Sequence, residues 1–114
     1  MARGERVIAR SAEIVERGPG VRFEVERHGK PRPAFAVRVE GLVRAYENVC
    51  AHQSVELDWM PGEFFDEERR HLICATHGAL YEPADGRCVA GPCLGAHLVP
   101  LAVVERDGQV LLIE

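Results

Sequence analysis

Two short segments that each pair one cysteine with one histidine constrain this chain more than any other feature. The first reads Cys-Ala-His at 50–52, and the second reads Cys-Ala-Thr-His at 74–77. Thiolate and imidazole are soft to borderline ligands that suit zinc, copper or iron–sulfur clusters. Each segment directly follows a strand-like run, so both lie at strand ends and can share one site. The candidate metal ligands are Cys50, His52, Cys74 and His77.

The unequal spacing of the two segments bears on the kind of metal. Structural zinc sites usually repeat a gap of about two to four residues between the ligands of each half. Cys-x-x-His suits that rule, whereas Cys-x-His is too tight for an ordinary zinc knuckle. A dinuclear iron cluster fits the pattern better, because each segment can give its cysteine to one iron and its histidine to the other.

The rest of the chain has the alternation and turn signals of β-structure. Apolar and charged residues alternate over 21–26, which predicts a strand with one solvent-exposed face. Residues 34–48 predict two strands joined by a hairpin turn at Glu40-Gly41. Prolines occur throughout the chain and make long helices unfavourable, so only residues 11–18 could form a helical turn. We therefore predict an all-β protein. Two further turns are expected at Asp85-Gly86 and Asp107-Gly108.

Size, charge and hydropathy narrow the class of protein. The 114 residues, of which 46% are hydrophobic, suit one domain, 1–114, whose core needs no disulfide. The net charge of −4 argues against nucleic-acid binding and leaves room for a positively charged protein partner. No apolar run resembles a secretion signal or a membrane span, so we expect a cytoplasmic protein with reduced thiols.

Two stretches interrupt the strand pattern. Residues 52–71 separate the ligand segments, and we interpret them as a surface loop pinned by Trp59, Phe64 and Phe65, with its charges in water. The alternative interpretation is a docking surface for a partner. Residues 89–95 form a Gly/Pro loop, the third loop that could close over the site.

Cys88 and Cys93 lie outside the ligand set. A disulfide between them is possible by spacing but disfavoured in a reducing compartment. Ligation is not expected, because the four-ligand set is already complete. We interpret both as packed thiols, with Cys93 lining the Gly/Pro loop near the metal. His28, His71 and His97 match no ligand position.

At the ligand residues the chain resembles Rieske [2Fe–2S] proteins, whose fingerprint is C-x-H followed by C-x-x-H-G. Gly78 completes the second half of that fingerprint, and Tyr81 follows four residues after the last ligand. Gly91-Pro92 stands at the distance expected of the family's proline loop. The resemblance extends over residues 44–112.

The resemblance implies a fold, a cofactor and roles for individual residues. The fold is one of stacked antiparallel sheets with a cluster-binding subdomain, about residues 48–95, formed by two ligand loops and a proline loop. The implied cofactor is a [2Fe–2S] cluster. Cys50 and Cys74 would hold the buried iron, and His52 and His77 the outer one. Residues implied to surround the cluster are Gly78, Tyr81, Pro92 and Cys93.

Several positions place the chain within the family. High-potential members carry an extra disulfide beside the cluster, and Val55 and Thr76 stand at those two cysteine positions. Ala79 stands where those members have a hydrogen-bonding serine. These substitutions point to the ferredoxin-like, low-potential branch, although that branch usually has phenylalanine in place of Tyr81. The interval 53–73 between the ligand segments is longer than in small ferredoxin-like members.

The implied function is one-electron transfer. We expect a standalone ferredoxin, or the electron-transfer component of an oxygenase/reductase system, with a reductase or an oxygenase as its redox partner. The reduction potential is expected in the lower half of the Rieske range of about −150 to +300 mV. The chain leaves no residues for a separate catalytic domain, so we do not expect an enzyme by itself. The alternative is a regulatory or structural subunit with a redox-sensing cluster or a zinc site.

Overall fold

The structure is a computed structural model that describes residues 4–114. These residues form ten strands and one 3₁₀ helix, with no α-helix among them, so the predicted all-β class is confirmed. No helix in this part of the chain has the length and apolar character needed to cross a membrane. In chain order the elements are β1 (Glu5–Arg10), η1 (Ser11–Glu13), β2 (Val21–Arg27), β3 (Lys30–Val39), β4 (Leu42–Glu47), β5 (Leu72–Ile73), β6 (Leu80–Tyr81), β7 (Cys88–Ala90), β8 (Pro100–Leu101), β9 (Val103–Arg106) and β10 (Gln109–Ile113).

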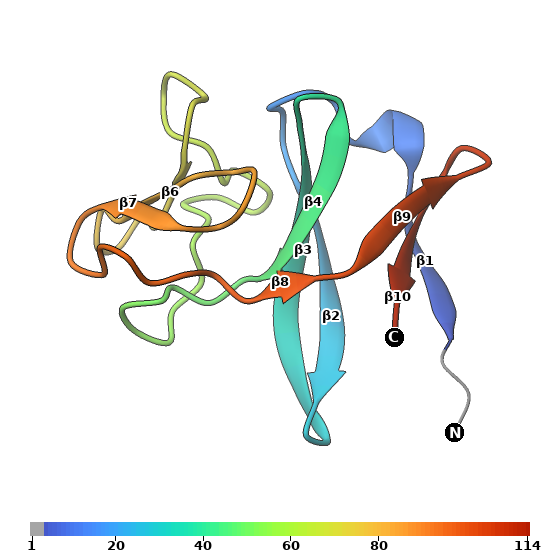
Figure 1. The fold of residues 1–114 in the computed structure, drawn as a ribbon, viewed down its shortest axis with the longest axis horizontal. Coiled ribbons are helices and arrows are strands. Elements are labelled where there is room, and N and C mark those ends of the chain that lie inside the picture. Colours follow the sequence, from blue (N-terminus) through green and yellow to red (C-terminus); the bar gives the residue numbers. More distant parts are fainter. Residues whose placement is uncertain (1–3) are drawn as a thin grey trace.

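The strands form three antiparallel sheets that follow one another along the molecule (Figure 1). The central sheet has the order β2-β3-β4-β8. The sheet β1-β10-β9 lies on one side of it, and the small sheet β5-β6-β7 lies on the other side, among the loops that carry the candidate ligands (Figure 1). The arrangement matches the stacked sheets and loop-rich end that the Rieske resemblance implies.

Two of the predicted hairpin turns have the conformation that their residues favour. Between β3 and β4, Glu40 and Gly41 have φ angles of 53° and 80°, and between β9 and β10, Asp107 and Gly108 have φ angles of 54° and 75°. Positive φ at both central residues gives a turn whose twist matches that of the flanking strands. Glycine at the second position adopts this conformation without steric cost.

β3 contains two prolines near its start. Because proline is uncommon in strands, the sequence predicted the strand only from residue 34, and the preceding turn at His28-Gly29 was not predicted. Residues 30–33 of β3 pair with β2 only, because β4 pairs with the later part of the strand. The Pro33 carbonyl accepts the Asn48 N–H at 2.7 Å, on the β4 side. In an antiparallel strand the N and C=O of one residue face the same side, so the Pro33 nitrogen faces away from β2. Pro31, two residues earlier, faces the same way, and neither proline removes a hydrogen bond to β2.

The central sheet is buried on both faces, which explains the nearly unbroken apolar run in β3. Phe35, Val37 and Val39 point to one face and belong to the core beneath the ligand loops. Ala34 and Ala36 point to the other face and belong to cores formed with residues of β1 and β10. The candidate site therefore stands on one side of a sheet whose other side is already packed.

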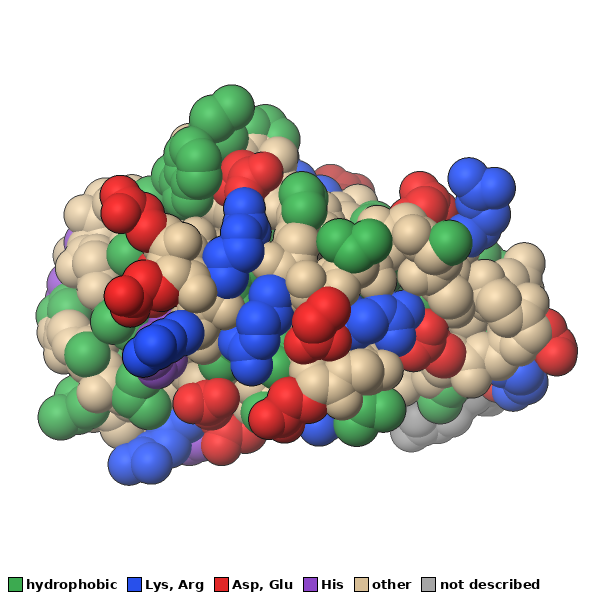
Figure 2. All heavy atoms as spheres, turned by 90° about the horizontal axis from the view of Figure 1, so that it is seen from above, with side chains coloured by type: hydrophobic (Ala, Val, Ile, Leu, Met, Phe, Trp, Pro, Cys, Tyr) green, Lys and Arg blue, Asp and Glu red, His purple; other side chains and the backbone are tan. Residues whose placement is uncertain are grey.

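Charged side chains of both signs are interspersed over the face seen from above (Figure 2). One ion pair joins two sheets: Arg38 of β3 lies 2.8 Å from Glu105 of β9, measured from Nη2 to Oε2. The Arg38 Nε also donates to the Ile14 carbonyl at 2.7 Å. The hydrogen bonds from this guanidinium lower the pKa of Glu105.

Candidate metal centre

The first ligand loop, residues 50–55, follows β4 and is fixed at two points. The Cys50 N–H donates to the Val55 carbonyl at 2.8 Å, which closes the loop. The Ala51 N–H donates to the hydroxyl of Tyr81 at 2.9 Å, so a side chain from β6 anchors the loop between its two candidate ligands. Residues 51–54 are exposed. The predicted strand before the loop is confirmed as β4.

The second ligand loop, residues 74–79, follows β5 and closes mostly on itself. The Cys74 N–H donates to the Ala79 carbonyl at 2.9 Å, and the Gly78 N–H donates to the Cys74 carbonyl at 2.7 Å. Gly78 has φ of 73°, in the left-handed region that favours glycine. No atom lies within 4 Å of a Cβ built there, so the backbone conformation, and not crowding, is the reason for a glycine. The Ala75 N–H donates to the Leu57 carbonyl, which ties this loop to the segment that precedes it.

The two loops bring three of the four predicted ligands into one group. The ligand atoms of Cys50, Cys74 and His77 all lie within 4.8 Å of one another. The Nδ1 of His77 is 3.6 Å from the sulfur of each cysteine. His52 is not part of this group, but its ring lies edge-on to the ring of His77, with 4.7 Å between the centroids. All four predicted ligands therefore gather at one end of the molecule.

Burial divides the four residues into an inner pair and an outer pair. Cys50 and Cys74 are 3% and 0% exposed. His77 is half-buried and His52 is exposed. The thiols thus face the protein interior, and the imidazoles lie between the thiols and solvent.

The surroundings of the two cysteines affect their ionisation in opposite directions. Burial works against the thiolate of Cys50, but hydrogen bonds with Tyr81 and His77 outweigh it and lower the pKa of Cys50 to about 6. Burial raises the pKa of Cys74. The first loop therefore supplies a ready thiolate, which is the form that binds metal.

Tyr81 connects the first ligand loop to the proline loop, residues 91–95. Its hydroxyl lies 3.4 Å from the sulfur of Cys50 and 3.3 Å from the sulfur of Cys93. The sulfur of Cys93 is 3.1 Å from that of Cys88 in β7. Burial raises the pKa of Tyr81, so its hydroxyl stays protonated and can donate. The predicted place of Cys93 near the candidate ligands agrees with these contacts, whereas Pro92 lies exposed at the turn of its loop.

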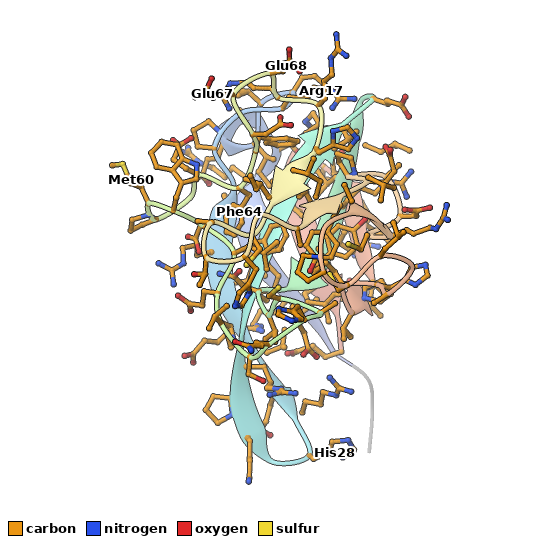
Figure 3. All side chains as sticks on the ribbon, turned by 90° about the vertical axis from the view of Figure 1, so that its left-hand side faces the viewer. Arg17, His28, Met60, Phe64, Glu67 and Glu68 are labelled. Carbon is orange, nitrogen blue, oxygen red and sulfur yellow. The ribbon has the colours of Figure 1, made fainter. Side chains whose placement is uncertain are left out.

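The segment between the ligand loops is anchored by only two of the three predicted aromatics. Phe64 and Phe65 are 0% and 3% exposed, and Phe64 stacks on Phe35 of β3 with 4.0 Å between ring centroids. Trp59 is 55% exposed, so the prediction that it helps to pin the loop is wrong. In Figure 3, which faces the ligand-loop end, Met60 points away from the molecule while Phe64 lies within it. Trp59 lies in a turn at 58–62 that is closed by a hydrogen bond from the Gly62 N–H to the Asp58 carboxylate at 3.1 Å.

Two polar residues that support the site were not identified from the sequence. Asn48 is fully buried; its side chain accepts the Leu57 N–H at 2.8 Å and donates to Asp58 at 3.0 Å. It thereby joins the segment between the loops to the end of β4. The Oε1 of Gln53 lies 3.1 Å from the Nε2 of His77. The only sequence signals were a polar residue two positions before Cys50, Asn48, and a polar residue directly after His52, Gln53. Neither is specific by itself.

The donor set fits a [2Fe–2S] cluster held by two thiolates and two imidazoles. Both cysteines of the ligand loops are free, their sulfurs are buried, and an imidazole nitrogen lies near each. Two imidazoles in place of two thiolates define a Rieske centre. The Rieske [2Fe–2S] domain model matches residues 5–110, and the chain belongs to this family. Its cofactor is a [2Fe–2S] cluster.

Solved structures share this fold over nearly the whole chain. The ferredoxin of carbazole 1,9a-dioxygenase from Nocardioides aromaticivorans IC177 superposes with a TM-score of 0.69 at 23% identity, covering 95% of each chain. The ferredoxin of Sphingomonas yanoikuyae B1 has a TM-score of 0.70 at 21% identity, covering 97% of this chain and 99% of that one. The terminal oxygenase of the Nocardioides system has a TM-score of 0.70 at 24% identity, but this chain corresponds to only 29% of it. No curated protein sequence matches the chain significantly.

Proposed function

We propose that this protein is a one-electron carrier of the ferredoxin type, acting between a reductase and an oxygenase in the cytoplasm. The observation that carries the proposal is the division of the four candidate ligands into buried thiols and outward imidazoles. When bound, a [2Fe–2S] cluster takes up and releases one electron. A carrier must also bring that electron close to a partner, and imidazoles on the solvent side, with His52 exposed and His77 half-buried, serve this purpose without a substrate pocket.

The proposed ligands are Cys50 and Cys74 for the inner iron and His52 and His77 for the outer iron. The cysteines come from the two loop starts, where backbone hydrogen bonds fix them. Tyr81 donates toward Cys50 and holds the first loop through Ala51. We further propose that residues 1–114 act as one domain, in which about 48–95 form the cluster-binding subdomain.

The nature of the partners is supported by the proteins that share the fold. They include the ferredoxin of a carbazole 1,9a-dioxygenase, the Sphingomonas yanoikuyae B1 ferredoxin, and a complex of oxygenase with ferredoxin in carbazole 1,9a-dioxygenase, which has a TM-score of 0.70 with this chain at 21% identity. This chain and each ferredoxin cover about nine-tenths or more of one another, whereas this chain corresponds to only 29% of the terminal oxygenase.

The test is an anaerobic redox titration of purified protein, with iron, acid-labile sulfide and zinc measured on the same sample. We expect two irons and two sulfides per chain, and a chromophore that is bleached by one electron equivalent. The reduced protein should be reoxidised by a terminal oxygenase of the carbazole type far faster than by dioxygen alone. A colourless protein with one zinc per chain would contradict the proposal and support a structural role. A loaded cluster that no reductase or oxygenase turns over would support a sensing role.

A further inference from the structure

Cys88 and Cys93 form a pair of thiols that electron transfer does not require. Their sulfurs lie 3.1 Å apart, and both cysteines are free. Cys88 is fully buried in β7, whereas Cys93 is partly exposed in the proline loop. One accessible thiol in direct contact with one protected thiol is the arrangement that thiol–disulfide exchange uses, because the first can react with a reagent and the second can then displace it.

The pair is also connected to a proposed cluster ligand through one hydroxyl. The oxygen of Tyr81 accepts the Ala51 N–H and has a single proton to donate. Two sulfurs are within reach of that proton, Cys50 at 3.4 Å and Cys93 at 3.3 Å. While Cys93 is a thiol, its one proton can be donated either to the Cys88 sulfur or to the Tyr81 oxygen, and in the second case the Tyr81 proton is left to Cys50. A disulfide sulfur has no proton, so it can only accept and competes with Cys50.

We propose that Cys88 and Cys93 are a reversible oxidation site for a small-molecule disulfide, and that their disulfide lowers the reduction potential of the centre through Tyr81. A hydrogen bond to a ligand sulfur favours the reduced state, because it withdraws electron density from the iron. Forming the disulfide weakens that bond. The effect on the potential rests on the proposed cluster, whereas the oxidation of the thiols does not.

The chemistry balances with the small-molecule disulfide as the only oxidant. The Cys93 thiolate attacks one sulfur of the reagent, which breaks its S–S bond, forms a mixed disulfide and releases one thiolate. Cys88 then loses its proton to the released thiolate or to water, and its sulfur attacks the sulfur of Cys93. That step breaks the mixed bond and releases the second thiolate. Two protein thiols are oxidised and one reagent disulfide is reduced to two thiols.

The environment of each sulfur sets the order of these steps. Burial raises the pKa of Cys88, so it is the poorer first nucleophile. Its S–H donates to the Ala90 carbonyl at 3.2 Å within its own strand. In a cytoplasm, disulfides are mostly transient and redox-sensing. A redox-active pair of thiols beside the cluster ligand would therefore couple the reduction potential of this electron carrier to the redox state of the cytoplasmic thiols.

The test uses the cluster-loaded protein equilibrated with oxidised glutathione and, separately, with reduced glutathione. After alkylation and trypsin digestion, residues 88–106 form one peptide that contains both cysteines. We expect this peptide to carry two alkyl groups after reduced glutathione, and an internal disulfide, lighter by two hydrogens than the dithiol, after oxidised glutathione. Cys88→Ser should instead retain glutathione on Cys93, and Cys93→Ser should react at neither position. Two alkyl groups on the wild-type peptide after excess oxidised glutathione would overturn the oxidation site.

The link to the cluster is tested by direct electrochemistry of the two forms. We expect the disulfide form to have the lower potential, and Tyr81→Phe to remove the difference while still forming the disulfide. Cys93→Ser keeps an O–H donor beside Tyr81 and should give one potential in both glutathione states. Equal potentials of the two wild-type forms, or an undiminished difference in Tyr81→Phe, would overturn the role of Tyr81. A protein without iron would contradict the proposed function, but it would still show whether the peptide forms its disulfide.

Discussion

Two regions of this molecule are held together in different ways. The strand region comprises β1–β4 and β8–β10, and the ligand-loop region comprises residues 48–98. In the strand region, β2 and β3 alone share seven paired positions. In the ligand-loop region the strands have only two or three residues each. Scattered backbone hydrogen bonds within the loops and a few single side chains, above all Asn48, Phe64 and Tyr81, hold that region instead.

The difference teaches where a single substitution should act. A ladder distributes its free energy over many backbone hydrogen bonds that no side-chain change removes. A loop held by one hydroxyl or one ring loses its geometry when that group is removed. Substitutions at the ligand loops should therefore change the metal centre more than the stability of the sheets, while a substitution on the far side of the strand region should change stability and leave the metal centre intact.

The largest effect is expected from the ligands. Cys50→Ser, Cys74→Ser, His52→Ala or His77→Ala should abolish or gravely impair cluster assembly, because each removes one of the four proposed metal ligands. Iron and sulfide analysis measures the loss, and far-UV circular dichroism checks the sheets.

The matched control for these variants is Cys88→Ser, a buried cysteine outside the proposed ligand set. It should keep iron and sulfide near the wild-type level. Loss of the cluster in this variant would show that the ligand assignment is wrong.

The next effect concerns the ring that joins the two regions. Phe64→Ala removes the stack on Phe35 and leaves a cavity, which should lower the free energy of unfolding by about 3 kcal/mol or more. Trp59→Ala removes a side chain that is 55% exposed and should change it far less. Thermal or denaturant unfolding of the two variants measures the contrast. Equal losses would mean that Trp59 is packed in solution, and slowed electron transfer in Trp59→Ala at unchanged stability would identify a docking residue.

A smaller effect is expected from the hydrogen bonds at the ligand sulfurs. A hydrogen bond worth about 1 kcal/mol shifts a one-electron potential by ~40 mV, since about 59 mV corresponds to 1.4 kcal/mol. Tyr81→Phe should lower the potential by an amount of this order, and Ala79→Ser should raise it if the new hydroxyl reaches a cluster sulfur. Voltammetry at fixed pH measures both, and a potential well above +100 mV in the wild type would contradict the low-potential assignment.

The smallest effect is expected from an ion pair confined to the strand region. The pKa of Glu105 is lowered by Arg38, so the pair stabilises the fold above the pKa of the unfolded carboxyl and loses this effect as pH falls through the folded pKa. Glu105→Gln should therefore lower the free energy of unfolding at neutral pH by less than about 1 kcal/mol, because the pair is partly exposed. In acid, its melting temperature should match that of the wild type. The cluster spectrum at neutral pH should not change. A constant gap at all pH values would exclude the carboxylate as the cause.

Sequence-based prediction succeeded where local chemistry determines structure. The Glu40-Gly41 and Asp107-Gly108 turns carry their own conformational signal, and both form as predicted. The ligand loops were found because two short segments that each pair a cysteine with a histidine are typical of a metal site. β1 was missed because its alternation is weak and Val7 is half exposed, so its pairing with β10 depends on residues about a hundred positions away.

The errors and omissions at the site have one physical cause. The burial of Phe64 and the exposure of Trp59 depend on which aromatic meets Phe35, and no local pattern specifies that choice. The contacts of Tyr81 with Cys50 and Cys93 likewise join three segments that the sequence keeps apart. Long-range side-chain contacts hold the ligand-loop region together, so this region was the harder one to predict.

The two prolines of β3 have a consequence for how the protein behaves in a crowded solution. Beyond the bond from the Asn48 N–H to the Pro33 carbonyl, the outer edge of residues 30–32 has no neighbouring strand, and such an edge is a template for pairing with another chain. Pro31 and Pro33 present no N–H along that edge. The intervening residue and the one before them are basic, Arg32 and Lys30. The β3 edge of the projecting β2–β3 arm is thereby poorly suited to edge-to-edge pairing with another chain, whereas the outer edge of β2, the first strand of that sheet, carries no such proline.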